Sequence, residues 1–167
     1  MTAYLDNSAT TPVCSEAVEA MKTAVTELWG NPSSLHQKGI EADEMLENAR
    51  SNVARRLFCR DDEVYFTSGG TESNNLAVQG AAHAMRRRGR RIVTTSVEHP
   101  SIDETVKHLE NEGFEVIRLG VDKNGRISER ELFEAVTPDT ILVSIMAVNN
   151  ETGTIQPVEA ARTAVTR

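Results

Sequence analysis

The chain has 167 residues, of which 39% are hydrophobic and 26% are charged, and this composition is typical of an ordinary soluble globular domain. Its 25 acidic residues outnumber the 18 basic ones and give a net charge of −7, which argues against binding to nucleic-acid phosphates. The two cysteines have no CxxC spacing, so we expect neither a disulfide framework nor a zinc site. No signal pattern or apolar run of membrane length is present, and we expect a cytoplasmic protein without a membrane partner.

The first 60 residues have the pattern of two amphipathic helices. Apolar side chains recur at helical spacing in residues 15–30, with Ser15 as the expected N-cap and Gly30 as the expected end. The same spacing recurs in residues 40–58. Neither segment carries side chains with an evident catalytic role, so we interpret both helices as packing elements.

From Glu63 onward, apolar segments alternate with amphipathic ones. We expect strands at residues 63–67, 91–97, 114–121 and 140–148, and helices at residues 71–89, 100–113, 128–136 and 157–167. Ser128 and Glu131 form an expected capping box, and Pro157 is expected in the first turn of the last helix. The alternation predicts an α/β fold, a mostly parallel sheet covered by helices, preceded by an N-terminal helical segment.

Two polar segments permit more than one interpretation. The basic run at residues 85–91 has the composition of a nucleic-acid patch or an import signal, but we interpret it as a helix C-terminus that ends at Gly89 and whose arginines complement the helix dipole. Residues 121–131 are similar to a calcium loop, except that Gly125 comes two positions early. We therefore expect a surface turn at Asn124 and Gly125.

The first expected strand is followed by "TSGGTESNN", which begins at residue 67. Gly69 and Gly70 would allow close backbone approach, and Thr71 opens a helix whose free N–H groups and dipole attract an anion. The segment matches neither established phosphate-loop pattern, and a Ser/Gly/Thr turn is also a common helix cap. Taken alone, the segment is either a phosphate-binding site or an ordinary turn.

Two further strand ends carry polar side chains, and ligands of parallel sheets bind at such ends. His99 follows the second expected strand and can stack on a flat ring or transfer a proton. Asn149 and Asn150 follow the fourth and offer neutral donors and acceptors. Each has a structural alternative, a packed histidine or a turn before Gly153. Together with the glycine segment, they favour a site for a phosphorylated aromatic cofactor.

Six motifs resemble one known family. They are "YLDNSATTP", "GNPSSLHQKG", "VYFTSGGTESNNLAVQG", "EHPSI", "EGFEV" and "ILVSIMAVNNETGTIQP". In order, from Tyr4 to Pro157, they resemble the N-terminal part of NifS/IscS-type cysteine desulfurases, which are pyridoxal 5′-phosphate (PLP) enzymes of fold type I in the class V aminotransferase group. The resemblance implies transfer of sulfur from L-cysteine to an enzyme persulfide, with L-alanine as product, for iron–sulfur clusters or thio-cofactors. A selenocysteine lyase, another class V enzyme and a non-catalytic scaffold module are the alternatives.

The resemblance also assigns roles to individual residues. Gly70, where relatives often have alanine, and Thr71 would hold the cofactor phosphate. His99 would stack on the pyridine ring and act as the catalytic acid or base, and Asn150 would hydrogen-bond near the ring hydroxyl and the substrate. His36 would line the mouth of the site across a dimer interface. The implied partners are L-cysteine, a second copy of the chain, and sulfur-acceptor or scaffold proteins.

Several parts of the family's site are missing from this sequence. None of the four lysines follows a buried strand, and neither Cys14 nor Cys59 matches the family's mobile-loop cysteine. We therefore expect the Schiff-base lysine, the pyridine-binding aspartate and the nucleophilic cysteine to lie in a further C-terminal part. Because Arg167 falls within an expected helix, the sequence indicates a cut there, and the chain alone is expected to be inactive and prone to aggregation.

The resemblance divides the chain into three parts. Residues 1–15 would be an N-terminal active-site segment, residues 16–60 a helical segment, and residues 61–167 the N-terminal portion of a PLP-binding large domain. In the family, later strands lie between earlier ones, so only the second and third expected strands would be neighbours in this chain.

Overall fold

The computed structural model describes residues 3–166 and divides the chain into two compact units, Met1–Phe66 and Thr67–Arg167. The predicted cut at Arg167 lies outside the described residues. Each unit is described by itself, and the candidate site lies in the second.

The first unit contains the two expected helices, α1 (Ser15–Thr26) and α2 (Gln37–Leu57), followed by the 3₁₀ helix η1 (Asp61–Glu63). The predicted cap of α1 was wrong, because Cys14 is the N-cap residue and makes no side-chain capping bond. The hydroxyl of Ser15 instead donates to the carboxylate of Glu16, at 3.0 Å. None of the α1 residues is buried, so this helix contributes no core of its own.

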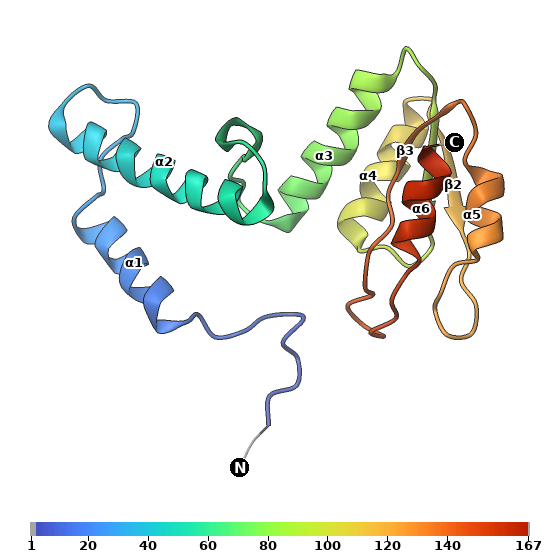
Figure 1. Ribbon diagram of the computed structural model, residues 1–167, viewed down its shortest axis with the longest axis horizontal. Coiled ribbons are helices and arrows are strands. Elements are labelled where there is room, and N and C mark those ends of the chain that lie inside the picture. Colours follow the sequence, from blue (N-terminus) through green and yellow to red (C-terminus); the bar gives the residue numbers. More distant parts are fainter. Residues whose placement is uncertain (1–2, 167) are drawn as a thin grey trace. The chain divides into compact units, whose positions relative to one another are not determined.

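The second unit confirms the α/β fold class (Figure 1). Its elements are α3 (Gly70–Met85), β1 (Arg91–Thr95), α4 (Pro100–Asn111), β2 (Glu115–Leu119), α5 (Glu129–Ala135), β3 (Thr140–Val143) and α6 (Val158–Val165). The three strands are parallel and lie in the order β2-β1-β3. One of the two bonds of the predicted capping box is present at the start of α5, where the Ser128 hydroxyl accepts a hydrogen bond from the backbone N–H of Glu131. Pro157 is the N-cap of α6 and directly precedes its first turn.

The strands differ from the predictions in three places. A strand was expected at residues 63–67, but Glu63 ends η1 and residues 64–67 have no hydrogen-bonded partner strand within the part of the chain that the structure describes. The expectation that only the second and third predicted strands are neighbours was also wrong, since β1 pairs with β2 on one side and with β3 on the other. The third difference is that β3 ends at Val143, because the backbone beyond it turns toward side chains at the end of β1, where the N–H of Met146 binds Glu98.

Alternating side chains of β1 supply the cores on the two faces of the sheet. Ile92 packs with buried residues of α3 and α4, and Val93 packs with Leu119 and with the buried Leu132 of α5. The period of two along a strand produces this division. The sheet therefore lies between α3 and α4 on one face and α5 and α6 on the other (Figure 1), and the strands' carboxyl ends open at one edge.

A turn between β2 and α5 is attached to the segment after β3. As predicted, Asn124 and Gly125 form the turn, with Gly125 at a φ of +77° and the Asp122 carboxylate accepting the N–H of Asn124 at 2.8 Å. The Thr154 hydroxyl donates to the Asn124 carbonyl at 2.7 Å, and the buried Gln156 amide donates to the Gly125 carbonyl at 2.6 Å. Within residues 3–166, no group of three or more His, Cys, Asp and Glu side chains is arranged to hold a metal ion. Across the same residues, no helix is apolar enough over a sufficient length to cross a bilayer.

Gly89 does not end α3, contrary to the prediction. The helix ends at Met85 with Arg86 as its C-cap, so the next arginines lie in the turn beyond it. A Cβ on Gly89 would collide with the backbone carbonyl of Asp139 and would lie 2.8 Å from its Oδ1. Gly89 is therefore required by the close approach of two backbone segments.

Replacing Gly89 with alanine should lower the free energy of unfolding by about 1–3 kcal/mol, because the backbone of Asp139 must move away from the new methyl group. Gly80 is a matched control on α3, where a built Cβ meets nothing within 4 Å. Gly80→Ala should raise stability by roughly 0.5–1 kcal/mol, since alanine favours the helix. Urea-induced unfolding of both variants measures the difference, and equal effects would contradict the collision.

Candidate functional site

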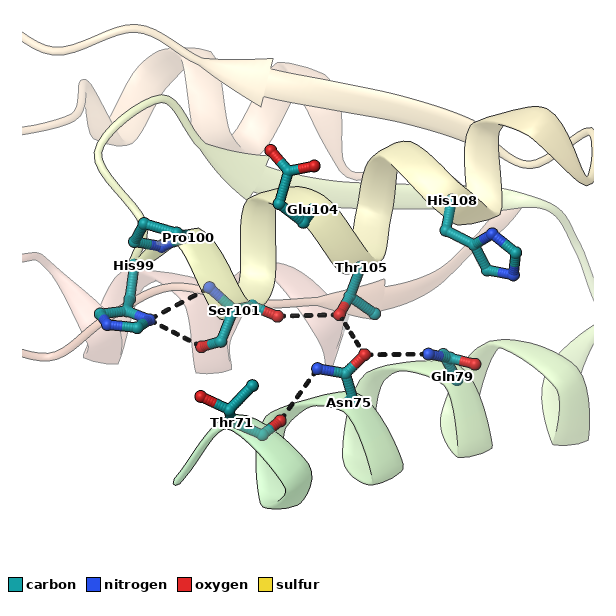
Figure 2. A pocket seen from close by; sticks show the side chains of 9 residues that line it. All are labelled: Thr71, Asn75, Gln79, His99, Pro100, Ser101, Glu104, Thr105 and His108. Carbon is teal, nitrogen blue, oxygen red and sulfur yellow. Dashed lines mark hydrogen bonds between the residues drawn. The ribbon is translucent and has the colours of Figure 1, made fainter. Parts of the chain in front are cut away.

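Two of the predicted site residues, Thr71 and His99, line one pocket between α3 and α4 (Figure 2). The pocket has a volume of about 440 Å³. Its lining residues are Thr71, Asn75, Gln79, His99, Pro100, Ser101, Glu104, Thr105 and His108. Residues from the first three turns of the two helices thus line a common space, which we call the α3–α4 pocket.

His99 is the N-cap of α4, and its hydrogen bonds define the state of its ring. Its Nδ1 accepts the backbone N–H of Ser101 at 3.1 Å and lies 2.8 Å from the Ser101 hydroxyl (Figure 2). Asn74 of α3 donates to that hydroxyl at 2.8 Å. Because a backbone N–H only donates, Nδ1 carries no proton, and the Ser101 hydroxyl donates to it. The neutral ring is therefore protonated at Nε2, which is the nitrogen left for a ligand.

The N-terminus of α3 has the features of an anion-binding site. Its N-cap, Gly69, offers no side-chain cap, and a Cβ built on Gly69 or on Gly70 would meet nothing within 4 Å. Backbone N–H groups of the first turn have no acceptor within the helix, and the space beside the two glycines is open. One carboxylate shares this helix end: Glu72 accepts the hydroxyl of Ser68 at 2.6 Å and its N–H at 2.7 Å, and these bonds lower the pKa of Glu72.

His99 also borders a second pocket, of about 340 Å³, which we call the loop pocket. It lies between the loop after β1 and the loop after β3, and it contains the third predicted position, Asn150. Its lining residues are Ser96, Val97, Glu98, His99, Pro100, Asn149, Asn150, Glu151 and Thr152. His99 is thus common to the pocket that contains Thr71 and the pocket that contains Asn150.

The two neighbouring asparagines of this loop differ in their surroundings. Asn149 is only 8% exposed, and its Oδ1 accepts the N–H groups of Glu151 and Thr152 at 3.0 and 2.9 Å. Its Nδ2 donates to the carbonyl of Val97 at 3.2 Å. Asn150 is exposed at the rim of the pocket. Asn149 therefore organises the loop, and Asn150 is presented by it.

Glu98 is a half-buried carboxylate in the loop pocket that the sequence did not single out. Its Oε1 accepts the hydroxyl of Thr95 at 2.9 Å and the backbone N–H of Met146 at 2.8 Å. Burial raises the pKa of the Glu98 carboxyl above its ordinary value of 4.5, although both hydrogen bonds favour the charged form. Desolvation is thus the larger effect at this position.

This raised pKa predicts a pH-dependent stability. The folded state binds the Glu98 proton more tightly than the unfolded state, so the stabilising contribution is fully present below pH 4.5 and is lost as the pH rises through the folded-state pKa. A glutamine does not titrate. The stability of Glu98→Gln relative to the unsubstituted protein should therefore increase between about pH 4 and pH 7. Urea unfolding at several pH values tests this, and parallel curves would contradict it.

The aminotransferase class-V family model matches residues 3–167. The chain belongs to the class-V aminotransferase family. It is 54% identical over 156 residues to the NifS/IcsS protein homolog of Lactobacillus delbrueckii subsp. bulgaricus and 51% identical over 156 residues to the cysteine desulfurase IscS of Methanosarcina thermophila. These alignments cover 93% of this chain but only 40% and 39% of the two relatives, so the chain spans well under half the length of these curated relatives.

Two solved structures have the same fold. A NifS-like protein matches with a TM-score of 0.93 at 44% identity, over 99% of this chain and 46% of the other. SspA in complex with cysteine matches with a TM-score of 0.89 at 36% identity, over 99% of this chain and 48% of the other. The resemblance to NifS/IscS-type proteins and the predicted fold class are both confirmed.

The predicted site residues could hold the phosphate and ring of PLP. The helix N-terminus at Gly70 and Thr71 has no side-chain cap, and the space beside Gly70 is open. The exposed His99 ring keeps a protonated Nε2, and the exposed Asn150 lies on the rim of a pocket that His99 also lines. His36 lies in the other unit, where it caps α2 by accepting the N–H of Gly39 at 3.3 Å.

Sequence reasoning missed the residues that connect the parts of the candidate site. Asn74 and Ser101 fix the tautomer of His99 from two helices, and Glu98 connects two loops. Their signal in the sequence is only adjacency, since each lies within three residues of a predicted site residue. Their partners are up to 48 residues away, so no local pattern reveals the contacts.

Proposed function

We propose that this chain is part of a PLP-dependent cysteine desulfurase, which converts L-cysteine to L-alanine and retains the sulfur as an enzyme persulfide. The observation that carries this proposal is the position of His99, which lines one pocket with Thr71 and a second with Asn150. Its support is the identity of about half the residues with a NifS/IcsS protein homolog and with a protein named cysteine desulfurase IscS. Acceptor or scaffold proteins would receive the sulfur for iron–sulfur clusters or thio-cofactors.

The described residues would have distinct roles. Backbone N–H groups at Gly70 and Thr71 would bind the phosphate, and Asn150 would hydrogen-bond the ring hydroxyl. His99 would lie against the ring and move a proton through Nε2, because its Nδ1 is occupied by Ser101. When bound, PLP supplies the electron sink that makes the Cα proton of cysteine acidic.

Other essential groups would come from outside this sequence. Lys107 is paired with Asp103 and Glu104, at 2.7 Å each, and neither it nor Lys123 lines the two pockets. We place the Schiff-base lysine and the persulfide-forming cysteine in a C-terminal part of the enzyme. The chain alone would then be inactive, and the complete enzyme would be a cytoplasmic homodimer.

The three predicted parts of the chain would have different places in the enzyme. Residues 1–15 would contribute to the mouth of the site, with His36 nearby in the assembled enzyme. Residues 16–60 would be a helical segment, and residues 61–167 would form the first portion of the large PLP-binding domain, which further chain completes.

Product analysis tests the proposal. The protein, isolated from its own cells with any chain that co-purifies, is supplied with PLP, a reductant and L-cysteine, and alanine and sulfide are measured. We expect both products in equal amounts. Alanine from L-selenocysteine alone would indicate a selenocysteine lyase, and alanine from neither substrate would indicate a non-catalytic module. Either result would overturn the desulfurase assignment.

A further inference from the structure

The loop after β1 and the loop after β3 are joined by two side chains from opposite directions. Glu98 reaches from the first loop to the N–H of Met146 at 2.8 Å. Asn149 reaches from the second loop to the carbonyl of Val97 at 3.2 Å. These bonds link the residues beside His99 to the residues beside Asn150. The positions of the two predicted site residues therefore depend on each other.

Of these two connections, the one made by Glu98 has the more unusual chemistry. Removing a carboxylate from water costs free energy. A neutral side chain of the same length would accept the same hydrogen bonds without that cost. Oε1 alone accepts both the Thr95 hydroxyl at the end of β1 and the Met146 N–H beyond β3. The oxygen thus bridges the ends of two adjacent parallel strands, where the sheet ladder has already stopped.

We propose that Glu98 is a positioning residue, which holds His99 and Asn150 on a common rim by binding the Met146 N–H. This rests on the proposed function, since it assumes that His99 and Asn150 serve one reaction. The requirement is an acceptor at the right distance, and the negative charge is not needed. Glu98 acts through the loops and takes no proton from the substrate.

Two substitutions distinguish the effect of the length of the Glu98 side chain from the effect of its charge. Glu98→Gln keeps the length of the side chain and an acceptor oxygen but removes the charge. Glu98→Asp keeps the charge but is one methylene shorter, so it cannot accept from Thr95 and Met146 together without moving the backbone. Glu134→Ala is the control, because Glu134 lies on α5 and is a largely exposed carboxylate 3.6 Å from Arg130.

The first readout is hydrogen exchange of the Met146 amide, which needs neither cofactor nor turnover. We expect exchange in Glu98→Asp to be at least about tenfold faster, the effect of losing a hydrogen bond of about 1.4 kcal/mol. Exchange in Glu98→Gln and Glu134→Ala should stay within about threefold of the unsubstituted protein. Unchanged protection in Glu98→Asp would overturn the proposal.

The second readout is alanine production from L-cysteine, with kcat and KM measured separately. We expect kcat to fall roughly 10–100-fold in Glu98→Asp, which is typical of lost positioning contacts, and Glu98→Gln to retain at least about a third of the unsubstituted kcat. A Glu98→Gln enzyme as defective as Glu98→Asp, or more so, would overturn the positioning role. If the unsubstituted protein makes no alanine, the proposed function fails, while hydrogen exchange still decides whether Glu98 holds the loops together.

Discussion

Replacing His99 with asparagine should lower turnover in the proposed desulfurase reaction by roughly 10²–10⁴-fold, the usual contribution of a positioned acid or base. Asparagine is among the best N-cap residues and can accept the Ser101 N–H in place of Nδ1. The fold should therefore be retained, with the free energy of unfolding within about 0.5 kcal/mol of the unsubstituted value. Alanine formation and urea unfolding, measured on the same preparation, separate the two effects.

His99→Ala is the matched comparison. It removes the cap together with the ring, so it should lose turnover to a similar extent and also destabilise the protein by about 1 kcal/mol. If His99→Asn retained more than about a tenth of the turnover, the imidazole would not be the group that transfers the proton.

Alanine substitution of the two neighbouring asparagines should affect different properties: stability at Asn149 and turnover at Asn150. Asn149→Ala leaves the Val97 carbonyl and the N–H groups of Glu151 and Thr152 without their partner, and we expect a loss of about 2–4 kcal/mol of stability. Asn150→Ala should change stability by less than about 0.5 kcal/mol, because the side chain is exposed. Its turnover should fall roughly tenfold, the effect of one hydrogen bond of about 1.4 kcal/mol.

Thermal or urea unfolding and alanine production distinguish these two variants. A destabilised Asn150→Ala protein with full turnover would contradict the assignment of Asn150 to the site. Asn149→Asp provides a further comparison, because it keeps an acceptor for Glu151 and Thr152 but loses the donor to Val97, and we expect a smaller loss of stability than for alanine.

The helices and three of the strands were predictable, because each follows from a local pattern. Val18, Met21 and Val25 recur at helical spacing, and the Ser128 cap is adjacent to the helix that it begins. The strand predicted at residues 63–67 was wrong, because β-propensity does not make a strand without a partner. Residues 64–66 have no partner strand within the described residues. The prediction that Gly89 ends α3 was wrong for a related reason. The residue that Gly89 closely approaches is Asp139, which is fifty residues away in the chain.

The candidate site was predictable only in its outline. Parallel strands explain why groups after β1 and β3 meet at one edge, and the resemblance predicted roles for Gly70, Thr71, His99 and Asn150. The pattern "NN" does not say which asparagine turns inward, because that depends on the carbonyl of Val97, 52 residues earlier. The tautomer of His99 likewise depends on Ser101, whose hydroxyl is held from another helix.

The turn at Asn124 and Gly125 has a consequence for how this protein tolerates change in sequence. A surface turn ordinarily accepts inserted residues at little cost. This one is held by Thr154 and Gln156, which belong to the same hairpin as Asn150. An insertion there would displace the hairpin that carries Asn150. A change in the length of this turn, which is far from both pockets along the chain, would therefore weaken binding of the proposed cofactor ring.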